Sequence, residues 1–310
     1  MTLDASGAIR VFHIGPQGAK ELDAIPQQVP AQGFVWIACT RAVFGERLPA
    51  LQAALQSLAG LQLVDLHVSD LLNAQLPSHY DYTSQYDVMV FRRLSATQCD
   101  TTEVPSLTGL APPRRAGPPV LRRIDTSPVG FAVFDQVLLS VHPGDCTVRD
   151  AFAARLLTAT QPAPAAEGGA TSETQARDMR TGPAPGSRLP TSPADLMLRV
   201  VNLIVDNYLD LRRELSRQLD HWQAELLRPR GRFANWSALL DARLTLHQLD
   251  EICEDQRAAV QDWVDTLETW ALPDNMAALR ELELLKVRSR DVLEHIERVV
   301  HHVRRLEQST

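Results

Sequence analysis

The sequence predicts an α+β fold, in which an α/β domain precedes long helices. Within residues 1–160, short apolar segments of strand type alternate with segments of helical periodicity. Within residues 192–310, the apolar residues recur at steps of three and four, which is typical of long amphipathic helices. Residues 161–191 separate the two parts, and their richness in Pro, Gly, Ala, Ser and Thr predicts a flexible linker.

The first domain opens with two predicted strands and two predicted helices. The segment IRVFHIG is β-branched or aromatic at several positions, and GFVWIAC (33–39) is a short continuous apolar run, so both predict strands. In ERLPALQAALQSLAG (46–60) the leucines lie at helical spacing, and Gly60 is a C-terminal signal. A second, short helix is predicted over residues 67–75, before a break at Pro77.

The remainder of the first domain predicts more strands and one more helix. Residues 86–94 (YDVMVFRRL) and 129–142 (VGFAVFDQVLLSVH) have strand composition, and the second segment contains a predicted turn at Asp135 and Gln136. Residues 145–159 return to helical periodicity.

Two long helices follow the linker. The first begins at Ser192, a suitable N-cap, with Pro193 at the first helical position, and it breaks at Arg228–Gly231; the second ends at Pro273. The seam of the first helix is Leu196, Val200, Leu203, Asn207, Leu211, Leu215, Leu219, Trp222 and Leu226. The seam of the second is Leu246, Leu249, Cys253, Gln256, Val260, Trp263, Leu267 and Trp270.

The third helix, over residues 282–306, has the a/d seam of a coiled coil or long bundle helix. Its seam is Leu282, Leu285, Ser289, Val292, Ile296, Val299, Val303 and Leu306. No Gly, Asn or Pro follows Leu306, so we expect a helix that has been cut short.

Composition restricts the compartment and the partners. A formal charge of −7 disfavours nucleic acid and anionic membrane, both of which select basic surfaces. The four cysteines are scattered without a ligand spacing, which indicates reduced thiols in a cytosolic compartment. The sequence shows neither a signal peptide nor an apolar run long enough to span a membrane, so we expect the chain as given to be soluble.

No catalytic motif is visible, so we expect neither an enzyme nor an organic cofactor. His295 and His302 are seven residues apart and share one helix face, which fits either a metal-binding or proton-sensing pair or an ordinary solvated or interfacial pair. Carboxylates that converge from the two parts of the chain would suit a hard cation such as Mg²⁺, but periodicity does not show whether they converge.

Four segments, taken in order, resemble the cytoplasmic portion of the CorA family of divalent-cation transporters, proteins of bacterial and archaeal inner membranes. LHVSDLLN (66–73) is similar to the family segment HPLxLEDxLN, and the strand YDVMVFRRL follows at the expected distance. Residues 194–227 are similar to the first long helix of the family, including its VDxY element at residues 205–208. Residues 286–300 resemble the start of the family's stalk helix, with its RDVxxH element at residues 290–295.

The resemblance implies an α/β domain with a mixed sheet between helices, followed by two long antiparallel helices. It also implies a funnel-shaped homopentamer in which the stalk helix continues into the first of two membrane spans. It implies a Mg²⁺ or Co²⁺ transporter of the inner membrane, with this portion in the cytoplasm. The chain ends within the expected stalk, and the two spans and the Gly-Met-Asn motif of the pore are absent. We therefore expect a truncated stalk helix, contact with the membrane only through the missing spans, and no ion conduction by this chain alone.

The resemblance also implies a regulatory Mg²⁺ site at the subunit boundary, formed by Asp70 and by Asp291 of a neighbouring subunit. Two further acids of the family are replaced here by Ser69 and Asn202. This loss is expected to weaken direct coordination but to allow a hydrated Mg²⁺ held by two charges. When the cation leaves, repulsion between the two carboxylates would loosen the ring and favour an open pore.

Two other functions stay open at this point. A ZntB-type branch of the family moves Zn²⁺ and shares the fold, and the loss of the acids at Ser69 and Asn202 makes it harder to exclude. Zn²⁺ prefers His or Cys ligands, however, and the sequence shows no obvious cluster of them. The third hypothesis is a soluble helical scaffold whose heptads serve only oligomerisation and which binds no metal.

Overall fold

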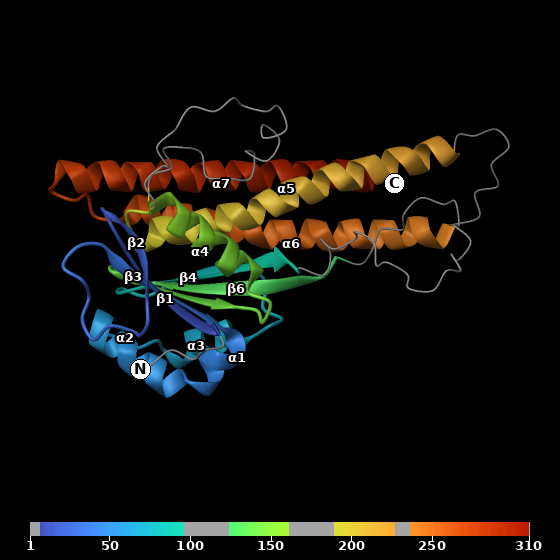
Figure 1. Ribbon diagram of the computed structural model, residues 1–310. Coiled ribbons are helices and arrows are strands. Elements are labelled where there is room, and N and C mark those ends of the chain that lie inside the picture. The colour runs from blue at the N-terminus through green and yellow to red at the C-terminus, as the bar shows by residue number, and fades with distance from the viewer. Residues whose placement is uncertain (1–6, 96–123, 161–188, 227–235, 310) are drawn as a thin grey trace, which may run out of the picture. The chain divides into compact units, whose positions relative to one another are not determined.

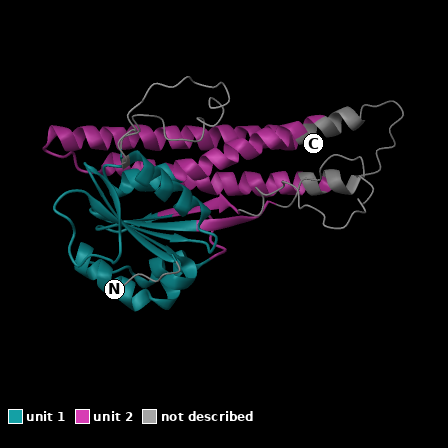
Figure 2. Cartoon of the chain, in the orientation of Figure 1, with its two compact units in different colours: residues 1–73, 81–89, 129–200 teal, residues 74–80, 90–128, 201–310 magenta. Residues whose placement is uncertain are grey.

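The computed structural model describes residues 7–95, 124–160, 189–226 and 236–309 (Figure 1). Over these residues it contains a seven-stranded mixed sheet and seven helices, which confirms the predicted α+β class. The chain forms two compact units (Figure 2). Unit 1 comprises residues 1–73, 81–89 and 129–200, and unit 2 comprises residues 74–80, 90–128 and 201–310.

The boundaries of these units differ from the predicted domain limits. The start of the first long helix, up to residue 200, groups with unit 1, and unit 2 includes two short pieces of the N-terminal half. Most of the predicted linker, residues 161–188, lies outside the described residues, as does the predicted helix break at residues 228–231. The division into residues 1–160, 161–191 and 192–310 therefore stays a prediction.

The sheet has the strand order β2-β1-β3-β7-β6-β5-β4. The strands are β1 (Ile9–Gly15), β2 (Gly18–Leu22), β3 (Phe34–Thr40), β4 (His79–Tyr82), β5 (Asp87–Leu94), β6 (Thr126–Val133) and β7 (Val137–His142). β3 and β7 are parallel, with Ile37 opposite Leu139, whereas β1 pairs with β2 and β3, and β6 with β7, in antiparallel register.

Burial on both faces explains the continuous apolar sequences of the two strands β3 and β7. All six residues of β7 and the first six of β3 are buried, because helices cover both faces of the sheet. The predicted turn at Asp135 and Gln136 is confirmed: both residues are exposed, and Phe134 N–H donates to Val137 O at 2.9 Å. The sequence prediction missed β2 and β4, which are short edge strands with few buried residues.

Helices lie on both faces of the sheet in unit 1 (Figure 1). They are α1 (Arg41–Glu46), α2 (Leu48–Ala59), α3 (Asp65–Leu72) and α4 (Thr147–Thr160). Buried side chains of α1–α3, such as Phe44, Leu55 and Leu71, pack in one apolar cluster with Val11 and Ile37 of the sheet. On the opposite face α4 packs its aromatic ring against β3, with Phe152 edge-on to Trp36.

The helix ends follow local chemistry. α2 ends as predicted at Gly60, which has φ 74° and donates its N–H to Gln56 O. α1 was not predicted; its first turn is capped by the Thr40 hydroxyl, which accepts from Val43 N–H at 3.3 Å. The predicted helix over residues 67–75 lies two to three residues earlier, as α3, because the backbone turns extended at Asn73.

Unit 2 is built on three helices, each 34 residues long. They are α5 (Pro193–Leu226), of which residues 201–226 belong to this unit, α6 (Trp236–Thr269) and α7 (Met276–Ser309). Figure 1 shows α6 and α7 side by side and antiparallel. The predicted seam of α7 is confirmed, since every member is buried except Leu306, which is half-buried. The seam of α6 is buried as far as Leu267, while Trp270 is exposed.

The predicted seam of α5 is wrong in its middle part. Asn207 is exposed and Leu203 and Leu211 are only half-buried. The buried series is instead Val201, Ile204, Val205 and Tyr208. Both series have helical spacing, and the tyrosine decides between them: its hydroxyl donates to Arg92 O at 3.1 Å, which fixes this face inward.

Candidate metal centre

Asp70, the first predicted cation ligand, lies half-buried on α3 in unit 1. The helix lies so close to the sheet that a methyl group added at Gly130 of β6 would come within 2.3 Å of Leu71 Cδ2. The backbone of the same residue is held as well, since Arg41 Nε donates to Leu71 O at 3.2 Å. The C-terminal half of α3, with Asp70, is therefore held from two directions.

The N-terminal half of α3 is held by a polar network around His67, which is 2% exposed. His67 Nδ1 lies 2.8 Å from Tyr86 Oη, and its Nε2 lies 3.2 Å from Asp81 Oδ2. Tyr86 Oη also accepts the Val64 N–H at 3.0 Å. Sequence reasoning missed this network because its members are 14 and 19 residues from His67 and are brought together by the strands.

Asp291, the second predicted ligand, lies on α7 in unit 2, and 61% of its side chain is exposed. The seam residues on either side of it, Ser289 and Val292, are buried, so the carboxylate lies off the packed face of the helix. Its ion-pair contact within the described residues is with His295, one turn away, at 3.8 Å between Nε2 and Oδ1. Such a long contact leaves the carboxylate oxygens accessible to a cation.

The two replaced acids occupy different environments. Ser69 is exposed on α3, whereas Asn202 is half-buried on α5 and donates from Nδ2 to Asp206 Oδ2 at 3.5 Å. The Asn202 Oδ1 atom is buried and accepts no hydrogen bond from the described residues. Asn202 therefore still offers an oxygen, the ligand atom that Mg²⁺ prefers.

The two predicted carboxylates would suit a hydrated Mg²⁺. Within the described part of one chain, no group of three or more His, Cys, Asp or Glu side chains is placed to hold a metal ion. The donors predicted from the sequence are two carboxylates, and Mg²⁺ usually keeps several waters beside one or two carboxylates. Such a site would use Asp70 and Asp291 as outer charges.

His295 and His302, the pair on α7 that the sequence singled out, have separate partners. His295 contacts Asp291, whereas His302 Nε2 lies 2.7 Å from Ser216 Oγ on α5 and its Nδ1 lies 3.1 Å from Arg305 NH2. Burial, together with Arg212 and Arg305, lowers the pKa of His302. Its surroundings favour the neutral imidazole, which fits the interfacial interpretation of this pair.

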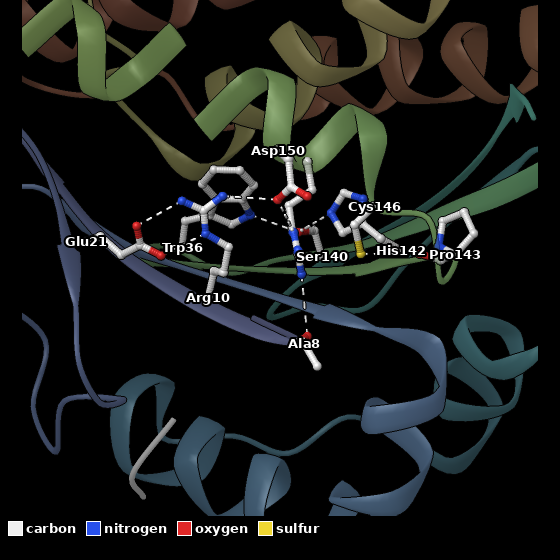
Figure 3. Close-up of polar contacts among 10 residues, drawn as sticks. Ala8, Arg10, Glu21, Trp36, Ser140, His142, Pro143, Cys146 and Asp150 are labelled. Atoms are coloured by element: carbon white, nitrogen blue, oxygen red, sulfur yellow. Dashed lines mark hydrogen bonds and ion pairs between the residues drawn. The ribbon is translucent and has the colours of Figure 1, made fainter. Parts of the chain in front are cut away.

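A second polar cluster lies on the α4 face of unit 1 (Figure 3). Arg10 donates to both oxygens of Glu21 at 2.7 and 2.8 Å and to Asp150 at 3.0 Å, and Arg149 also donates to Asp150 at 2.9 Å. Two arginines thus face two acids. Beside them Trp36 Nε1–H donates to Ser140 Oγ, which is also 2.8 Å from His142 Nε2.

This cluster is structural. Ser140 and His142 are each 0% exposed, so no substrate reaches them despite their resemblance to a nucleophile and base. The arginine pair ties α4 to the edge of the sheet through Asp150 and Glu21.

Unit 2 contains a polar cleft of about 670 Å³. Its lining includes three acids, Asp125, Glu251 and Asp255, and one cation, Arg92. The Arg92 guanidinium is engaged by Leu76 O and by Thr126, and burial, followed by Glu251, raises the pKa of Asp255. Neither Asp70 nor Asp291 lines this cleft.

The family model for CorA-like Mg²⁺ transporter proteins matches residues 32–310. The chain belongs to the CorA-like Mg²⁺ transporter family. A comparison with curated protein sequences finds no match. Within the described residues, no helix of this CorA-like chain is both long and apolar enough to cross a membrane.

Solved structures are similar to this CorA-like chain at low sequence identity, and two of them have TM-scores above 0.5. The soluble domain of CorA from Methanocaldococcus jannaschii is 13% identical, with a TM-score of 0.54, and the match covers 99% of this chain and 96% of that one. The full-length CmaX protein is 16% identical, with a TM-score of 0.52 and coverage of 97% and 75%. The ZntB cytoplasmic domain from Vibrio parahaemolyticus is 15% identical, with a TM-score of 0.49 and coverage of 97% and 95%.

Proposed function

We propose that this chain is the cytoplasmic regulatory portion of a Mg²⁺ or Co²⁺ transporter of the inner membrane, and that it senses the cation between subunits of a homopentamer. Family membership over residues 32–310 supports the transporter class. The observation that carries the sensor is the placement of Asp291, exposed on α7 between two buried seam positions. It can therefore face another subunit without disturbing its own packing. The proposal needs no catalytic step and no organic cofactor.

The mechanism is electrostatic. Asp70 of one subunit and Asp291 of the next would hold the cation, which supplies positive charge between them. Without it, the two like charges would repel each other, and this repulsion would oppose closure of the ring. The work of the protein is to keep both carboxylates in place: α3 is anchored by Leu71 and by His67, and α7 by its buried seam.

The affinity of this site should be modest. Ser69 and Asn202 remove two charges that the family motif would place there, so the cation keeps more of its own water. Exposed charges are also screened at physiological salt, so the response should weaken as ionic strength rises.

Thermal unfolding in a MgCl2 titration tests the proposal. Because a ligand that binds only the folded form stabilises it, Mg²⁺ should raise the melting temperature of the wild type. Asp70→Lys and Asp291→Lys should each abolish this rise. The control variant Glu297→Gln removes an exposed acid of α7, the helix that carries Asp291, and should retain the rise. An undiminished rise in both lysine variants would refute the sensor.

The ion and the assembly need their own measurements. Titrations with Co²⁺ and Zn²⁺ under the same conditions show whether the melting temperature responds to Mg²⁺ and Co²⁺, as proposed, or to Zn²⁺. Mass measurement at several protein concentrations tests self-association, which Mg²⁺ should promote if the cation bridges subunits. A mass that stays that of one chain at every Mg²⁺ concentration would count against a bridging cation.

A further inference from the structure

The helix that carries Asp70 is anchored by a buried relay of three side chains, Tyr86, His67 and Asp81. We propose that His67 is a positioning residue, which sets the orientation of Asp70 for cation binding through this relay. The inference rests on the proposed function, since it concerns the cation response assigned to Asp70.

The protons of the relay can be assigned from its geometry. An ionised Asp81 only accepts, so His67 Nε2–H donates to it across 3.2 Å. In the neutral ring, His67 Nδ1 is then the acceptor, and Tyr86 O–H donates to it across 2.8 Å. The same tyrosine oxygen accepts the Val64 N–H, so every group of the relay has a partner.

The relay supports the start of α3. α3 is only eight residues long and has no side-chain hydrogen bond at its N-cap, Val64. Tyr86 Oη accepts the backbone N–H of Val64 and also contacts His67 in the first turn of the helix. A short helix has little intrinsic stability, so such tertiary contacts decide its orientation.

His67 is placed to control Asp70 in particular. The two residues are three apart on α3 and therefore neighbours on the helix surface. The far end of the relay is itself fixed, because Asp81 Oδ1 accepts the Tyr82 N–H at 2.8 Å. A helix held at His67 and at Leu71 resists rotation about its axis, and this fixes the direction in which the Cα–Cβ bond of Asp70 points.

His67 does not contact the cation itself. Only 2% of the residue is exposed, and both ring nitrogens are used within the relay. Its role therefore resembles that of residues that do not bind a metal but hold its ligands in place. Loss of such a supporting contact typically lowers metal affinity about 10- to 100-fold. For a hydrated site held by two charges we expect the lower end, an increase of about 10-fold in the Mg²⁺ concentration at half-response.

Tyr86→Phe is the sharpest variant, because it removes only the hydroxyl and keeps the ring packed against Phe134 at 4.9 Å between centroids. His67→Phe removes both hydrogen bonds of the ring. His67→Asn keeps an acceptor near the Nδ1 position, and His67→Gln keeps a donor near Nε2, so each should recover part of the response. Tyr82→Phe, in which a tyrosine that is 60% exposed loses its hydroxyl, is the matched control.

The experiment is a MgCl2 titration of the melting temperature, from which the metal-free value and the Mg²⁺ concentration at half-response are read separately. We expect Tyr86→Phe and His67→Phe to raise that concentration, with His67→Asn and His67→Gln between them and the wild type. A purely structural role would lower the metal-free melting temperature and leave the half-response concentration unchanged. That result in Tyr86→Phe would overturn the inference while leaving the proposed function intact.

A wild type that does not respond to Mg²⁺ at all would overturn the proposed function and the inference with it. If His67→Phe does not fold, Tyr86→Phe and His67→Asn still decide the outcome.

Discussion

Ser289 is a polar residue on the apolar seam of α7, and the structure accounts for it. Its hydroxyl is fully buried, accepts Trp263 Nε1–H at 2.9 Å and donates to Leu285 O at 2.9 Å. The serine therefore supplies the hydrogen-bond acceptor for a buried indole N–H between α6 and α7. A buried polar group with both partners present contributes little net cost, whereas removal of one partner is expensive.

Ser289→Ala should therefore destabilise unit 2 by about 1–3 kcal/mol, because the buried indole N–H of Trp263 loses its acceptor. Urea unfolding followed by tryptophan fluorescence measures the difference. Ser84→Ala, at an exposed serine, is the control and should change the midpoint little. An equal midpoint for Ser289→Ala and wild type would show that the hydrogen bond does not contribute.

Stability should also depend on pH through Glu21. The hydrogen bond from Arg10 lowers the pKa of Glu21 below its ordinary value of 4.5, against the opposing effect of burial. A depressed folded-state pKa means that this stabilisation is complete above the unfolded value and is lost as the pH falls through the folded value. The urea midpoint should therefore fall less in Glu21→Gln than in wild type between about pH 6 and about pH 3. An equal fall in both would contradict this role.

The residues of the candidate site could be predicted only in part. Asp70 and Asp291 follow from local segments that resemble the CorA family, because each lies within a recognisable motif. His67 has no such signal: its partners Tyr86 and Asp81 reach it only after β4 and β5 have formed. Hydrogen-bond partners that are remote in sequence are not encoded in local periodicity.

At the scale of the element, Gly33 shows how tightly β1 and β3 meet. It has φ +85°, and a Cβ atom there would lie 2.1 Å from Ile14 O, a backbone atom that cannot easily move. Gly60, which ends α2, also has positive φ but has no atom within 4 Å of the same position. A side chain at Gly60 would therefore cost only the strain of a positive φ, whereas a side chain at Gly33 would cost this strain and a steric clash as well.

Gly33→Ala should consequently cost more stability than Gly60→Ala. The conformational term is about 1–2 kcal/mol for each, and only Gly33→Ala adds a backbone clash. Equilibrium unfolding of the two variants side by side gives the comparison. A Gly60→Ala protein that is as unstable as Gly33→Ala would show that the clash is relieved by a small movement.

Elements with a strong pattern were the predictable ones. β3, β7 and the seams of α6 and α7 have long apolar runs or sustained heptads, and burial matches them. β2 and β4 are edge strands with few buried residues, and they have no such pattern. In α5 two apolar series compete, and the choice depends on the hydrogen bond of Tyr208 to Arg92 O, which periodicity does not contain.

At the scale of the whole molecule, the proposed sensor depends on more than one copy of the chain. The described residues of one chain hold no cluster of three metal ligands, and the two predicted carboxylates belong to different units. In the proposed sensor, one subunit supplies Asp70 and its neighbour supplies Asp291, so the response to a cation should depend on contact between subunits.

The central claim is tested most directly by mixing two inactive variants, Asp70→Asn and Asp291→Asn, under conditions where subunits exchange. At some interfaces of the mixed oligomer, the intact Asp70 of one chain meets the intact Asp291 of the other. We predict that neither variant alone responds to Mg²⁺ and that the mixture recovers part of the wild-type rise in melting temperature. A mixture that stays as unresponsive as its components, in spite of demonstrated subunit exchange, would contradict a cation site shared between subunits.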